Sequence, residues 1–172
     1  MAGVLSSRVR NGSAAPTSLV YGTQVPRQRG ITVKYMILMN GSQRDYDMLA
    51  GKPTDSPAWT PEDVAALHQF MAKWNNELVE SGEFVDARGL AAPVHTRRIQ
   101  LKDGVPVVTD GPYAETQEVL AGYTIVECDS FDRATEIAAR LANTPHPANA
   151  TLANEWYVDV RLIAEGIGDL DG

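Results

Sequence analysis

The alternation of apolar and polar residues divides the chain into strand-like and helix-like segments. Residues 32–40 are almost continuously apolar, which indicates a central strand buried on both faces. Residues 64–78 repeat apolar side chains at helical spacing. They follow a strong helix start at residues 60–63 and precede Gly82, so this segment predicts a long helix. A second, shorter helix is predicted after Ser130, which can serve as its N-cap.

Further strands are indicated elsewhere by short apolar runs. They cover residues 84–90, 97–101, 105–109, 123–127 and 156–163. Asp103-Gly104 joins two of them as a tight hairpin turn, and Pro106 places the second arm of this hairpin at a sheet edge or outside the main sheet. Residues 41–59 are interpreted as a long loop, of the kind that forms lids or partner contacts.

The order of these segments predicts the fold. It is βαββαβ with an inserted β-hairpin, a ferredoxin-like α+β arrangement. The two helices would cover one face of the sheet. Because residues 33–39 do not alternate, the other face must also be buried, and a homodimer is the economical way to bury it.

Length and composition suit one domain with extensions. The chain has 172 residues, and we assign residues 32–164 to the domain and residues 165–172 to a flexible tail. Residues 1–31 are rich in Ser, Gly, Pro and Arg and lack periodicity. They could be a transit peptide, a binding tail or an upstream artefact, and we favour disorder or artefact.

Net charge and cysteine content limit which partners and which cellular setting are expected. The net charge is −7, from 15 Lys and Arg against 22 Asp and Glu. The first 30 residues hold four Arg and no acid, so the remaining residues carry a net charge of −11. An acidic domain of this kind favours a basic protein partner over nucleic acid. Cys128 is the single cysteine, which excludes an intrachain disulfide and fits a reducing, cytoplasmic setting. No apolar run is long enough for a membrane span.

Candidate chemistry gathers first around the Asp-Gly-Pro turn in residues 107–118. Each of its three residues favours a turn, so the backbone there should be stiff and could hold Asp110, Tyr113 and Glu115 at a cavity mouth. Asp110 could act as a general acid or base, or could simply brace its own turn through backbone N–H groups. A solvated surface is the alternative for Glu115.

Three more residues are candidates from other segments. His68, at the edge of the helical stripe, is either a general base facing a cavity or a packed histidine. Arg161 could hold an anionic oxygen, or could pair with Glu115 or Asp86 at a dimer interface. Tyr123 is expected in the core with its hydroxyl at the pocket. The three histidines lie on separate segments, so no metal or cofactor is predicted.

Several of these stretches resemble a known family. Residues 34–39, Gly89-Leu90 and above all residues 109–116, followed by Gly122-Tyr123, resemble the YCII-related family, in the branch named for its Asp-Gly-Pro-Phe signature. The resemblance implies a dimeric α+β barrel, usually in a small cytoplasmic bacterial protein. It also implies frequent association with extracytoplasmic-function sigma factors and an activity that is largely unassigned.

The chain departs from the family pattern at several positions. Tyr113 replaces the usual Phe, and Leu162-Ile163 replaces the usual Pro-Val. Arg88 stands where an acid is common and Gln117 where Lys is common, changes that could remove a charge pair. More distant YCII-type enzymes are thought to use a His from the first helix region, which aligns near Met71, so that role is not carried over to His68.

Two functions compete on this evidence. The first is a dimeric binding or accessory module, with a ligand contacted by Arg88, Tyr113, Glu115, Tyr123 and Arg161. The alternative is a lyase or isomerase that uses Asp110 or His68 as general acid or base on a small anionic carbonyl or phenolic substrate. Convergence of Asp110, His68 and Arg161 in one cavity would favour the enzyme.

Overall fold

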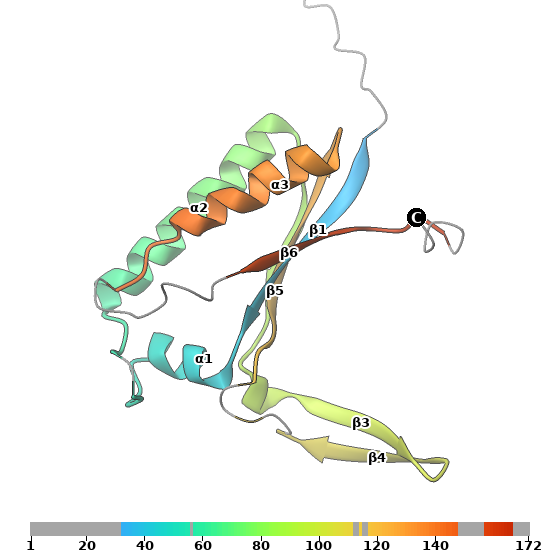
Figure 1. Cartoon of the computed structure of the whole chain (residues 1–172). Helices are drawn as coiled ribbons and strands as arrows, with labels where there is room; N and C mark the ends of the chain where they lie inside the picture. Colours follow the sequence, from blue (N-terminus) through green and yellow to red (C-terminus); the bar gives the residue numbers. More distant parts are fainter. Residues whose placement is uncertain (1–31, 56, 112–113, 115–116, 148–156, 167–172) are drawn as a thin grey trace, which may run out of the picture.

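A computed structural model of the chain describes residues 32–55, 57–111, 114, 117–147 and 157–166 (Figure 1). The elements follow one another as β1 (Val33–Gly41), α1 (Gln43–Leu49), α2 (Pro61–Ser81), β2 (Phe84–Gly89), η1 (Pro93–His95), β3 (Arg97–Lys102), β4 (Val105–Asp110), β5 (Val119–Cys128), α3 (Phe131–Ala139), η2 (Arg140–Asn143) and β6 (Val158–Leu162).

Four of the strands form one antiparallel sheet in the order β2-β5-β1-β6. The two apolar strands β1 and β5 lie in its centre, with Tyr35 opposite Val126 and Met36 opposite Ile125. β6 pairs with the other edge of β1, and β2 pairs with the other edge of β5. The predicted α+β, ferredoxin-like fold is therefore confirmed.

Helices α2 and α3 lie together on one side of this sheet (Figure 1). The predicted start of α2 is present as a capping box, in which Thr60 accepts from the Asp63 amide and the Asp63 carboxylate accepts from the Thr60 amide. Gly82 ends the helix at φ 77°, the left-handed conformation that glycine adopts without steric cost. Local signals alone thus determine where α2 begins and ends.

The core lies between the sheet and these two helices. Trp74 and Leu78 of α2 and Ile137 of α3 are almost completely buried against Ile37 and Val126 of the sheet. Trp74 is thereby confirmed as a core residue. The remaining buried core members are Tyr35, Cys128, Ala134, Ala138 and Leu141.

Strands β3 and β4 form a separate two-stranded sheet outside the main one, as Pro106 predicts. Asp103 and Gly104 turn the chain with φ of 50° and 80°, which is the pattern of a two-residue hairpin turn with both φ values positive. The hairpin leaves the end of the four-stranded sheet and projects to the side opposite α2 and α3 (Figure 1).

The interpretation of residues 41–59 as a loop is wrong in its first part, which forms helix α1. Ser42 caps this helix, and the Asp45 carboxylate accepts in turn from the Ser42 amide. The Tyr46 hydroxyl donates to the Leu90 carbonyl oxygen at 2.8 Å. A tertiary contact therefore stabilises a helix of seven residues, which would be marginal by itself.

Among the helices of the described residues, none has the length and apolar character needed to cross a bilayer.

Candidate functional site

On the side of the four-stranded sheet that faces away from α2 and α3, the described residues of one chain form no second layer. We call this side the open face. Directly opposed residues of an antiparallel pair point to the same side of a sheet, so the register identifies its members. They are Lys34, Met36 and Leu38 of β1, Asp86 and Arg88 of β2, Tyr123, Ile125 and Glu127 of β5, and Asp159 and Arg161 of β6.

The open face is apolar in the middle and charged at its edges. Met36, Leu38 and Ile125 lie on the two central strands and are only half-buried, whereas their helix-facing neighbours Ile37 and Val126 are fully buried. Three cations and three acids surround this centre, so the face is electrically neutral on a chain of net charge −7. Two copies of such a face could meet without net repulsion.

Three open-face residues form a connected polar cluster. The Tyr123 hydroxyl donates to Asp86 Oδ2 at 3.0 Å, and Arg88 Nη1 lies 2.8 Å from Asp86 Oδ1. Arg88 Nη1 also donates to the Ala87 carbonyl oxygen at 2.8 Å. The other guanidinium nitrogens of Arg88 have no partner within the described part of the chain, and they remain able to bind an anion.

The cluster holds Tyr123 in its protonated form. The hydrogen bond to Asp86 raises the pKa of Tyr123, and burial and the Asp86 charge raise it further, while Arg88 opposes them. The phenol is therefore neutral at physiological pH. The Tyr123 hydroxyl donates its proton to the hydrogen bond with Asp86, so the lone pairs of its oxygen can accept a hydrogen bond from a ligand.

Arg161 lies on the same face, opposite Met36 in edge strand β6. Its side chain has no hydrogen bond or ion pair with the residues that the structure describes. Within one chain it cannot reach Asp86, because β1 and β5 separate their strands and three strand spacings amount to roughly 14 Å. Arg88 and Arg161 thus mark the two opposite edges of one face.

The two candidate acid–base residues are placed elsewhere. Asp110 ends β4 and is exposed. Its Oδ1 accepts from Arg97 Nε at 2.9 Å, so a cross-strand ion pair engages this carboxylate. His68 is exposed on α2, in the helix layer. Asp110, His68 and Arg161 therefore do not converge within one chain, and Tyr113 and Glu115 lie outside the described residues.

Sequence reasoning assigned no ligand-site role to Asp86, the residue that organises the cluster. It accepts from Tyr123 and binds Arg88, so the acid that the family pattern leads one to expect at position 88 has a counterpart two residues earlier. The spacing of Asp86 and Arg88 was the available signal, because residues i and i+2 of a strand share a face. Which partner strand they meet could not be read from that spacing.

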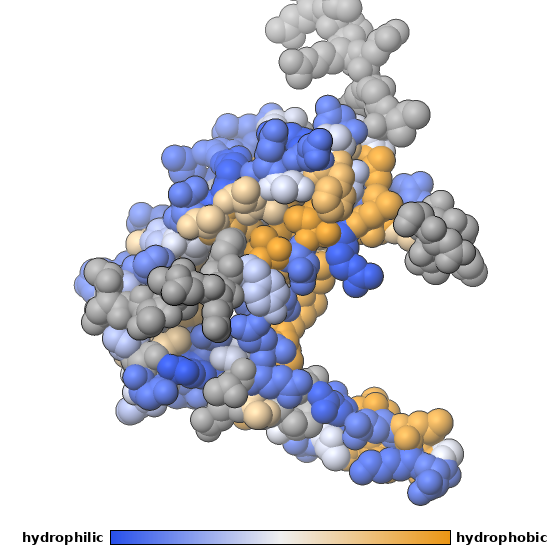
Figure 2. Space-filling model, in the orientation of Figure 1, coloured by the Kyte–Doolittle hydropathy of each residue, from blue (hydrophilic) through white to orange (hydrophobic). Residues whose placement is uncertain are grey.

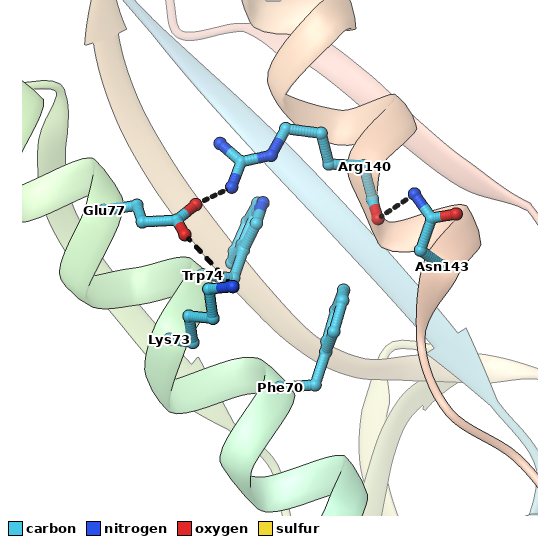
Figure 3. Close-up of a pocket in the computed structure, with 6 residues that line it drawn as sticks. All are labelled: Phe70, Lys73, Trp74, Glu77, Arg140 and Asn143. Carbon is cyan, nitrogen blue, oxygen red and sulfur yellow. Dashed lines mark hydrogen bonds and ion pairs between the residues drawn. The ribbon is translucent and has the colours of Figure 1, made fainter.

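A second concave site lies in the helix layer between α2 and η2 (Figure 3). It measures about 140 Å³ and is lined by Phe70, Lys73, Trp74, Glu77, Arg140 and Asn143. Glu77 binds Arg140 directly and lies 3.9 Å from Lys73, so the acid offsets one of the two positive charges of the lining. None of the residues predicted from the sequence as site residues lines this depression.

Side chains of the types that bind metal ions also lie apart from one another in the described part of the chain. No group of three His, Cys, Asp or Glu side chains there is arranged to hold a metal ion. Cys128 is buried, and burial is the main reason that the pKa of its thiol is raised, which keeps it in the unreactive protonated form.

Comparison with known proteins places the chain in a family. An uncharacterized protein of Rhizobium meliloti (strain 1021) is 29% identical over 86 residues, which cover 50% of this chain and 69% of that protein. The family model of the YCII-related domain matches residues 33–152, from β1 to beyond η2. The Asp-Gly-Pro-Phe branch within this family stays a prediction. The chain belongs to the YCII-related domain family.

Proposed function

We propose that this protein is a small-ligand-binding module that acts as a homodimer, with the ligand held over the open face. The observation that supports this most directly is the combination on one surface of an apolar centre and the Tyr123–Asp86–Arg88 cluster. Binding sites for small molecules typically combine apolar walls with a few fixed polar groups. A second subunit would supply the opposite wall, which one chain lacks.

The chemistry of the cluster defines the ligand class. Arg88 keeps unused N–H groups and its side chain is 66% exposed, so it can bind a carboxylate or enolate oxygen. Met36 and Ile125 lie beside the cluster and suit a flat or aliphatic body. We therefore expect a small organic acid with an apolar part, such as an aromatic acid or an enol.

The dimer is tested by placing a charge in the centre of the open face. Met36→Lys should convert a dimer to a folded monomer in sedimentation analysis, because removing the lysine charge from water at the apolar centre of a closed interface carries a desolvation cost. Val79→Lys is the matched control, since Val79 is 58% exposed on α2 in the helix layer, and it should leave the dimer intact. A wild-type protein that sediments as a monomer would overturn the proposal.

The ligand is tested by thermal shift against a panel of aromatic acids and enols. A compound at 100 times its Kd should stabilise the protein by about 2.7 kcal/mol, which raises Tm by roughly 5–10 °C for a chain of this size. Arg88→Gln should remove this shift, whereas Lys73→Gln, an exposed change on α2, should retain it. If no compound shifts Tm, or if Arg88→Gln retains the shift, the ligand site is not here.

The geometry gives less support to the two alternative functions, catalysis and association with a sigma factor. A lyase or isomerase built on Asp110 or His68 would need a second subunit to bring these residues to Arg161, because one chain keeps them on three separate elements. Association with a sigma factor remains an expectation from the family resemblance, for which the acidic character of the domain is the supporting feature. We therefore place ligand binding first.

A further inference from the structure

The β3–β4 hairpin is joined to the body at its root. It forms a two-stranded sheet of its own, with no ladder to the four-stranded sheet in the described residues. At the root, the Gly111 amide donates to the Thr96 carbonyl oxygen at 3.0 Å, and the Val94 amide donates to Gln43 Oε1 of α1 at 2.9 Å. An isolated two-stranded hairpin is marginally stable in water, so an arm of this kind needs a surface to lie on.

The register divides the arm into two unlike faces. Ile99 pairs with Val108 and Leu101 with Pro106, so these four apolar side chains share one face, with the Arg97–Asp110 ion pair at the root of the same face. Ile99 is 71% exposed, Leu101 73% and Val108 56%, so the described residues leave these side chains largely uncovered. The opposite face carries Arg98, Gln100, Lys102 and Thr109 together with Val105 and Val107.

This separation is the pattern of a strand pair with one side buried and one side in water. In the described part of one chain, no element packs on the side that carries Ile99, Leu101 and Val108. Figure 2 shows hydrophobic atoms near the free end of the arm and, across an open hollow, along the sheet. Between these two regions, Leu90 and Val94 are also exposed, at 42% and 57%, where the chain passes from β2 to the arm. The exposed apolar residues therefore continue from the sheet to the arm.

We propose that the β3–β4 hairpin is a clasping arm that lies along a second copy of this chain. The arm projects on the side of the sheet away from the helices, which is the side where the open face requires a partner (Figure 1). A two-fold axis would place each arm on the other subunit and cover both apolar arm faces at once. This inference rests on the homodimer of the proposed function and adds the contact that fixes how the subunits are oriented.

Charge favours a copy of this chain as the occupant. Residues 97–110 hold three basic and two acidic residues, a net charge of +1, whereas residues 31–96 and 111–172 together hold eight basic and 20 acidic ones, a net charge of −12. A weakly basic arm is attracted to such a body, and a strongly basic partner is not attracted to the arm.

Cross-linking tests where the arm lies. Leu101→Cys places a single accessible thiol on the apolar face, because the native Cys128 is only 3% exposed. A photoactivatable label on this thiol, in a mixture of isotope-labelled and unlabelled full-length chains, should yield cross-links between chains. Gln100→Cys, one residue away on the opposite face, should yield fewer of them. Cross-links confined to one chain would overturn the inference.

A second measurement separates this inference from the dimer itself. Ile99→Gln combined with Leu101→Gln should weaken the dimer at least tenfold in sedimentation equilibrium, while Val79→Gln should leave it unchanged. If the wild-type chain is a monomer, both the proposed function and the clasping arm fail. If the wild-type chain is a dimer that the double substitution does not weaken, only the clasping arm fails.

Discussion

Replacing Glu83 by Gln should destabilise the fold measurably, because Glu83 joins the end of α2 to α3. Its two carboxylate oxygens accept from Arg133 Nε at 2.7 Å and Nη2 at 2.9 Å, and Oε2 also accepts from the Ser81 hydroxyl at 2.7 Å. The Glu83 side chain is 16% exposed and that of Arg133 is 38% exposed. Hydrogen bonds to charged groups contribute about 1.5–3 kcal/mol, whereas exposed ion pairs contribute about 0–1 kcal/mol.

Since this pair is bidentate but partly screened, we expect Glu83→Gln to cost about 2 kcal/mol, or a fall in Tm of roughly 5–8 °C. Glutamine keeps the shape but places an NH₂ group against an Arg133 N–H donor. Glu136→Gln is the matched control, since Glu136 pairs with the same arginine at 3.1 Å but is 68% exposed, and it should cost less than about 0.5 kcal/mol.

The pH dependence gives an independent check of the same reasoning. Arg133 and Ser81 lower the pKa of Glu83 below its ordinary value of 4.5, against the opposing effect of burial. The stabilisation is therefore complete above the unfolded-state pKa and is lost as the pH falls through the lower folded-state value. Chemical denaturation should show wild type and Glu83→Gln differing at neutral pH and converging in acid. Equal stabilities at neutral pH, or a difference that grows in acid, would refute the reasoning.

Three further changes test the packing of the sheet and the start of α2. Gly122→Ala should destabilise by about 1–3 kcal/mol in thermal denaturation, because a Cβ there would lie 2.9 Å from the Arg88 carbonyl oxygen. Thr124→Val should raise stability by about 1 kcal/mol, since Thr124 is 1% exposed and its hydroxyl has no partner in the described part of the chain; an unchanged or lower Tm would contradict this. Thr60→Ala should cost about 1 kcal/mol, because the Asp63 amide loses its hydrogen bond to the Thr60 hydroxyl, and an unchanged Tm would contradict this.

The parts of the fold that the sequence could predict are those encoded within a few residues. The start and end of α2 follow from Thr60 and Gly82, and the hairpin follows from Asp103-Gly104. These signals act through local backbone geometry, so no knowledge of the tertiary structure is needed to use them. The order of the predicted elements then leaves few topologies, and the ferredoxin-like one was correct.

The sequence analysis missed helix α1, which is stabilised partly by a residue far away in the chain. Asp45 and Asp47 were interpreted as loop residues, yet Asp45 completes the cap at Ser42 and Asp47 binds Lys52 at 2.7 Å. The helix is also held by Tyr46, whose partner Leu90 is 44 residues away in the chain. The Ser42–Asp45 capping box was an available local signal for its start, but the distant contact on which a seven-residue helix depends does not show in the local pattern.

The ligand-binding roles of the candidate residues stay predictions, but the structure shows how these residues lie relative to one another. Arg88, Tyr123 and Arg161 were chosen singly, and the strand register brings all three to one face, since Arg88 lies opposite Tyr123 and Arg161 opposite Met36. Asp110 was expected at a cavity, but within one chain it lies exposed at the end of the arm strand β4. Turn chemistry predicts the bend of the chain at this point but not what the bend faces, because that depends on long-range pairing.

The open face and the arm have the same origin in the sequence. Residues 33–39 are apolar on both sides of a strand, yet the helices of one chain cover only the side that includes Tyr35 and Ile37. The hairpin likewise carries an apolar side that none of the described elements of its own chain covers. Two apolar surfaces that the described residues leave uncovered on the same side of one sheet support the proposed homodimer, since a second copy would bring the same two surfaces to meet them.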